Sequence, residues 1–191
     1  MANATNLNQK VVLWASAHRG KKVGAGQCWD LGEEALRRAG AMTSNDLGDV
    51  GDDTDYVWGD EVAIKDVIPG DILQFRDHTA TITTTATYAF ADGTTETVTQ
   101  EETATREHHT AIANGTLQSD GSLRTLEQHT KPKGDVVQNL KVYTRSVAPH
   151  VVMAHERRKY PHGTRIENVK VTKTVKITVA GTIWAYRPKS K

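Results

Sequence analysis

Cys28 is the only cysteine in the 191-residue chain, and it lies in the stretch VGAGQCWDLGEEALRRAG at positions 23–40. A glycine-rich turn precedes it, and an amphipathic helix is predicted to begin at it. The unpaired N–H groups and the positive end of the helix dipole stabilise a thiolate relative to a thiol, and they can also hold a developing oxyanion. A lone cysteine is otherwise a small, inert core residue. Its chemistry therefore depends on whether a base reaches it.

The helix that would position Cys28 has clear local signals. Acidic residues occupy its early turns, Arg37 and Arg38 lie in its last turn, and Gly40 follows its end. That charge order suits the helix dipole, and glycine suits the position after a helix. An apolar stripe in residues 8–18 predicts an earlier helix.

From residue 63 onward the pattern is typical of β-strands. Pro69-Gly70 predicts a turn into a strand at 72–75, and the threonine-rich residues 79–105 predict a long polar hairpin that turns at Asp92-Gly93. Alternating strands follow at 108–118, 122–129 and 135–145, and a β-rich tail covers 165–188. We therefore expect one α+β domain over residues 1–191, in which helices pack on an antiparallel sheet or half-barrel. Residues 79–105 would be a hairpin insertion, and residues 145–191 a β-rich C-terminal extension.

Composition excludes several classes of protein. Lys and Arg total 24 against 23 Asp and Glu, a net charge of +1, which argues against a nucleic-acid or membrane-surface partner. The N-terminus lacks the pattern of a secretory signal, and no apolar run reaches the ~18 residues of a membrane span. We expect a soluble protein, cytoplasmic or exported without a cleavable signal. The acidic residues 41–62 lack the register of a calcium-binding EF-hand loop, so no metal is predicted.

Four motifs together resemble a known family. They are GQCWDL at 26–31, IPGDILQF at 68–75, HTAIANG at 109–115 and LEQH at 126–129, and they occur in this order on a predicted helix and successive strands. The set resembles the papain-like amidases and peptidases of the NlpC/P60 and CHAP superfamily over residues 10–143. It is also similar to the cysteine-proteinase-fold domain at the end of some fungal actin-patch proteins.

The resemblance implies roles for individual residues. Cys28 would be the nucleophile and His109 the general base, while His108 would point to the opposite face of the strand. The CHAP pattern EQN nominates Glu127 as the residue that orients the base, whereas the second histidine of the NlpC/P60 pattern nominates His129. Glu127 and His129 are two residues apart and share a strand face.

Strand register bears on that choice. If the connection at Asp120-Gly121 is a three-residue loop, His129 lies opposite Ala111 and is closer to His109 than Glu127 is, which favours His129. A two-residue loop would turn both side chains away unless a bulge intervenes. Both candidates therefore stay open, with a slight preference for His129.

The implied function is a cysteine hydrolase that cleaves an amide bond in a peptide or a peptidoglycan stem peptide. It would need no metal or organic cofactor. One alternative is a non-catalytic binding or interaction module of the same fold, with a protein partner on the 79–105 hairpin. Another is a protein deamidase or acyltransferase that uses the same residues.

Overall fold

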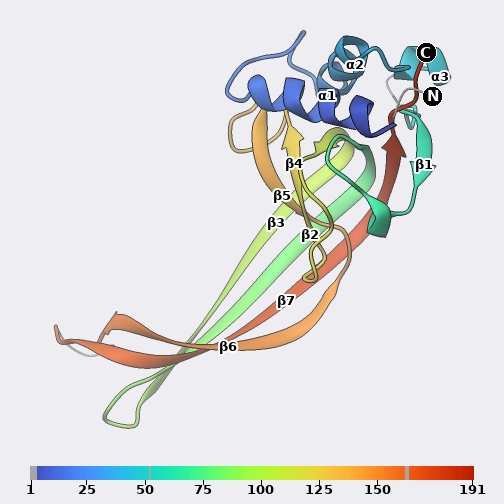
Figure 1. Cartoon of the computed structure of the whole chain (residues 1–191). Helices are drawn as coiled ribbons and strands as arrows, with labels where there is room; N and C mark the ends of the chain where they lie inside the picture. Colours follow the sequence, from blue (N-terminus) through green and yellow to red (C-terminus); the bar gives the residue numbers. More distant parts are fainter. Residues whose placement is uncertain (1–3, 52, 162–163) are drawn as a thin grey trace.

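A layer of helices covers one end of a long antiparallel sheet (Figure 1). The computed structural model describes residues 4–51, 53–161 and 164–191. The helices are α1 (Ala4–Ala17), α2 (Cys28–Ala39), α3 (Ser44–Leu47) and the short 3-10 helix η1 (Ile64–Asp66). The strands are β1 (Asp60–Val62), β2 (Ile72–Ala89), β3 (Thr95–Ala113), β4 (Ser122–Glu127), β5 (Gln138–Tyr143), β6 (Val147–Lys159) and β7 (Ile166–Arg187). Among these residues, no helix is long and apolar enough to cross a membrane.

The sheet has the order β1-β7-β2-β3-β4-β5, and β6 pairs with β7 outside this path. Each of these strand pairs is antiparallel. The expected α+β class with an antiparallel sheet is therefore confirmed. The path of the described strands is open, with β1 at one end and β5 at the other, so it does not close into a barrel.

The outer halves of the longest strands form a projection that we call the arm (residues 79–105, 147–159 and 166–180). The threonine-rich segment is the outer part of β2 and β3, which stay paired out to Ala89 and Thr95. β7 pairs with β2 over the same length, and β6 completes the arm on the far side of β7. In Figure 1 the arm extends well away from the helices. The C-terminal segment therefore adds two strands to the hairpin, and β7 continues back into the core.

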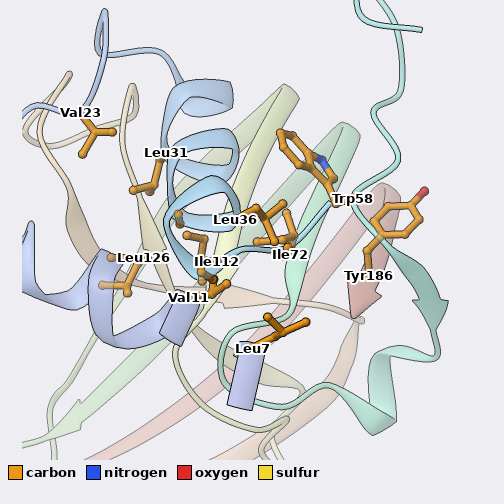
Figure 2. Close-up of a cluster of buried hydrophobic side chains, with 14 of the residues drawn as sticks. Leu7, Val11, Val23, Leu31, Leu36, Trp58, Ile72, Ile112, Leu126 and Tyr186 are labelled. Atoms are coloured by element: carbon orange, nitrogen blue, oxygen red, sulfur yellow. The ribbon is translucent and has the colours of Figure 1, made fainter. Parts of the chain in front are cut away.

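The helices pack on the near end of the sheet because α2 is amphipathic. Its buried side is formed by Leu31, Gly32, Ala35, Leu36 and Ala39. A methyl group on Gly32 would lie 3.2 Å from the side chains of Trp58 and Thr110, so a glycine here permits close contact between helix and sheet. The main core combines side chains from α1, from α2 and from the sheet, as Figure 2 shows for Val11, Leu36, Ile72, Ile112 and Leu126.

Alternate residues of the same strands build a second cluster, as the two-residue period of a strand requires. Leu73 and Phe75 of β2 and Leu123 of β4 belong to it. A third, smaller cluster lies in the arm and contains Tyr88, Phe90 and Val171. The arm thus has apolar contacts of its own.

The Pro69-Gly70 turn joins the helices to the sheet. Gly70 has φ +93°, and a Cβ there would lie 2.1 Å from the backbone oxygen of Asn8. The buried carboxylate of Asp71 accepts hydrogen bonds from the Asn8 side chain at 2.7 Å and from Arg187 at 3.0 and 3.2 Å. This turn therefore connects the first helix, the second strand and the end of the last strand.

Candidate active site

Cys28 is the first residue of α2, as the sequence indicates. Gln27 before it is extended, and its N–H donates to the Asp30 carboxylate at 2.9 Å, which fixes the first turn. The thiol is half-buried and lines a cavity of about 430 Å³. Burial raises the pKa of Cys28, but a hydrogen bond and charge interaction with His109 and the backbone N–H groups of Thr110 and Trp29 outweigh it, so the pKa is lowered.

His109 lies on β3 between two partners and is only 5% exposed. One ring nitrogen, Nε2, donates to Glu127 Oε2 at 3.1 Å, and the ring also hydrogen-bonds the Cys28 sulfur. Burial lowers the pKa of His109, but these two partners raise it to about 9. The pKa values of Cys28 and His109 are thus displaced in opposite directions. Both displacements favour the thiolate–imidazolium form of the pair over the neutral form.

Glu127 ends β4 and is completely buried. Arg106 donates to its two oxygens from Nε at 2.8 Å and from Nη2 at 3.1 Å, and the hydroxyl of Thr125 also donates to it. Burial raises the pKa of Glu127, while its bonds to His109 and Arg106 lower it to about 2. The side chain is therefore an ionised acceptor that holds the imidazole of His109 in one orientation.

The slight preference for His129 over Glu127 is corrected by this geometry. The observed pairs are Ile112 with Leu126 and Ala113 with Thr125, so the register places Glu127 beside Ala111, two residues from the expected alignment. A two-residue offset keeps every side chain on its face, so Glu127 lies on the expected face, and it is the residue that hydrogen-bonds His109. His129 lies beyond the strand, is exposed and has φ +60°.

His129 and His108 nevertheless line the Cys28 cavity. The Nε2 atom of His108 lies 2.7 Å from the backbone oxygen of Thr54, and its ring lies against Tyr56. His108 therefore lies at the rim of the site, and His109 is the histidine that contacts the thiol.

The family model for the AIM3/BBC1 cysteine proteinase-fold domain matches residues 1–191. The chain belongs to this family. No match was found among curated proteins or among solved structures.

Membership in the AIM3/BBC1 family confirms the resemblance to the cysteine-proteinase-fold domain of fungal actin-patch proteins and the papain-like fold. The finer likeness to NlpC/P60 and CHAP enzymes stays a resemblance. Within the described part of this AIM3/BBC1 domain, no group of three or more His, Cys, Asp or Glu side chains is arranged to hold a metal ion.

Arg106 is the site residue that sequence reasoning missed in this AIM3/BBC1 domain. In a regular strand, Arg106 and His109 are three residues apart and point to opposite faces. The β2–β3 pairing omits Asp77, whose φ is +52°, and the β2–β7 register shifts between Arg76 and Thr79. Arg106 pairs with His78, next to this irregularity, and its side chain reaches Glu127. No local sequence signal marks it.

Proposed function

We propose that this domain is a cysteine hydrolase that cleaves an amide bond of a peptide substrate. Cys28 is the nucleophile, His109 the general acid and base, and Glu127 the residue that orients His109. The observation that carries the proposal is the chain of hydrogen bonds from Cys28 through His109 to the buried Glu127, with the pKa of Cys28 lowered and that of His109 raised.

The geometry supports an acyl-transfer mechanism. The Cys28 thiolate attacks the carbonyl carbon, and the electron pair of the C=O bond moves to oxygen, where the backbone N–H of Cys28, which has no acceptor within the helix at this first position, stabilises it. His109 gives its proton to the departing amine as the C–N bond breaks. It then removes a proton from water, which attacks the thioester and releases the acid and the thiolate.

Alkylation of the thiol tests the proposal directly. An ordinary thiol of pKa ~8.5 is less than about 1% ionised at pH 6 and reacts slowly with iodoacetamide. We expect folded protein to react at least about tenfold faster at pH 6 than the same chain in urea. Because the pKa of Cys28 is lowered, the labelling rate should begin to fall at a lower pH than it does for an ordinary thiol.

The chain provides its own control, because Cys28 is its only cysteine and the unfolded protein reports the unperturbed thiol. His109→Ala should slow labelling of the folded protein at pH 6. Equal, slow rates for folded wild type and His109→Ala would refute the enzyme proposal. Peptide, peptidoglycan and protein-glutamine substrates then separate peptidase, stem-peptide amidase and deamidase activity.

One observation favours an interaction module as the second candidate. Val151, Val152 and Met153 are consecutive exposed apolar residues on β6, and among the described strands β6 pairs only with β7. An unpaired apolar edge is where an extended chain adds to a sheet. A partner that binds wild type and Cys28→Ser equally, with no turnover of any substrate class, would support this alternative.

A further inference from the structure

Three hollows that share lining residues lie around the thiol. The hollow of about 380 Å³ between α1 and α2, which we call the α1–α2 pocket, shares Trp29 and Asp30 with the Cys28 cavity. The Cys28 cavity in turn shares His108 and His129 with a hollow of about 300 Å³ that contains His109. The hollow lined by Cys28 therefore adjoins both the α1–α2 pocket and the hollow that contains His109. Adjoining hollows of this kind suit successive side chains of a peptide.

The α1–α2 pocket has aromatic walls. Trp14 of α1 and Trp29 of α2 are both half-buried and line it. The imidazole of His18 stacks on the Trp14 ring at 3.9 Å, and Trp29 Nε1 donates to the Ser44 hydroxyl at 2.9 Å. Indole faces attract cations, and they also pack the aliphatic stems of long side chains.

Two cations and one carboxylate that line the pocket have partners already. Glu34 binds Arg38 at 3.0 Å, and it also binds Arg37. Lys22 binds Asp135 at 3.0 Å. Within these ion pairs the positive and negative charges largely cancel.

The remaining carboxylates of the pocket, Asp30 and Glu33, have neutral hydrogen-bond donors. Asp30 accepts from the Gln27 backbone N–H, and Glu33 accepts from the Ser44 hydroxyl at 3.0 Å and the Asn45 amide at 2.7 Å. Ser44 is only 2% exposed, and it holds both the Trp29 wall and the Glu33 charge. The negative charges of Asp30 and Glu33 are thus held in place at the pocket.

We infer that the α1–α2 pocket binds the side chain of a lysine or arginine that lies close to the scissile bond of the peptide substrate. The inference rests on the proposed hydrolase function. Trp14 and Trp29 contact the aliphatic stem and the cation, and Glu33 with Asp30 compensates its charge. Trp29, which follows Cys28 directly in the chain, lines both this pocket and the Cys28 cavity.

Peptidyl chloromethyl ketones test this assignment. The Cys28 thiolate forms a bond to the methylene carbon and chloride leaves, so labelling of the single thiol is followed by mass spectrometry. The reagents are acetylated tripeptides of glycine that carry lysine, leucine or glutamate at one of the three positions. We expect the lysine reagent to react about tenfold faster than the glutamate reagent at one position, and faster than the leucine reagent there.

Variants of Glu33 separate binding from folding. Glu33→Gln keeps the size of the side chain and should reduce the lysine-over-glutamate ratio at least about threefold, whereas Glu33→Lys should invert it. Glu101→Gln, which removes an equal charge on the arm, should leave the ratio unchanged. Iodoacetamide labelling of Glu101→Gln should match that of wild type, and for each Glu33 variant the chloromethyl ketone rates are divided by the iodoacetamide rate of the same protein.

Two failures are distinguishable. Slow iodoacetamide labelling of wild type at pH 6 overturns the hydrolase proposal itself. Fast labelling with no preference for lysine at any position, or a preference that survives Glu33→Gln, overturns only the assignment of the α1–α2 pocket.

Discussion

Replacing Glu127 by glutamine separates the two interactions that this carboxylate makes. Glu127→Gln keeps the shape of a side chain that is 0% exposed but removes its charge, on which both Arg106 and His109 depend. Arg106, itself 6% exposed, becomes a buried guanidinium without a counter-ion. His109 loses one of the two partners that raise its pKa to about 9. Stability and thiol reactivity should therefore both fall, for different reasons.

The stability loss comes from Arg106. Removing one partner of a buried ion pair costs about 3–5 kcal/mol, and for a chain of this size that corresponds to a lower melting temperature by roughly 6–20 °C. Exchanging both partners for uncharged side chains is close to neutral. Arg106→Met combined with Glu127→Gln should therefore recover most of the stability lost in Glu127→Gln.

The reactivity loss comes from His109. A neighbouring carboxylate within hydrogen-bond reach shifts a pKa by about 1–3 units, so without it His109 is a weaker partner for the Cys28 thiolate. We expect iodoacetamide labelling at pH 6 to slow at least about tenfold in Glu127→Gln. The slow labelling should persist in the double variant although its stability returns.

Melting curves and labelling rates on the same three proteins check both parts. Labelling of Glu127→Gln at the wild-type rate would refute the role of Glu127 in supporting the ion pair. Recovery of labelling together with stability in the double variant would show that reactivity follows folding alone.

Two further predictions concern His129 and Gly70. Because His129 lies outside β4 and the bond to His109 comes from Glu127, His129→Ala should label with iodoacetamide within about twofold of wild type, and a slowing as large as that of Glu127→Gln would restore His129 as the orienting residue. Gly70→Ala should lower the free energy of unfolding by at least about 2 kcal/mol in urea titrations, because its Cβ would meet the Asn8 oxygen at a left-handed backbone position, and an unchanged midpoint would contradict that reasoning.

Local patterns predicted the elements that carry the site. The start of α2 at Cys28 and its end before Gly40 follow from charge order and a left-handed glycine, which is observed at φ +77°. The family resemblance selected His109, alternation along β3 placed its neighbour His108 on the opposite face, and the same parity placed Glu127 on the face of His109. These signals depend on residues within a few positions of each other, so the sequence alone contains them.

Non-local contacts decided the rest. The register of β4 on β3 depends on loop length and packing across the sheet, and a two-residue offset replaced His129 with Glu127 beside His109. Pairing of β2 with β7, about 100 positions later in the chain, turned an expected hairpin into a four-stranded arm.

The sequence by itself therefore determined which residue is the thiol, which histidine faces it and that helices cover an antiparallel sheet. Only the tertiary structure brought Arg106 to Glu127 and enclosed that carboxylate completely. The physical reason is that burial and charge pairing depend on the whole surrounding core. Together they set the pKa values that make Cys28 a candidate nucleophile.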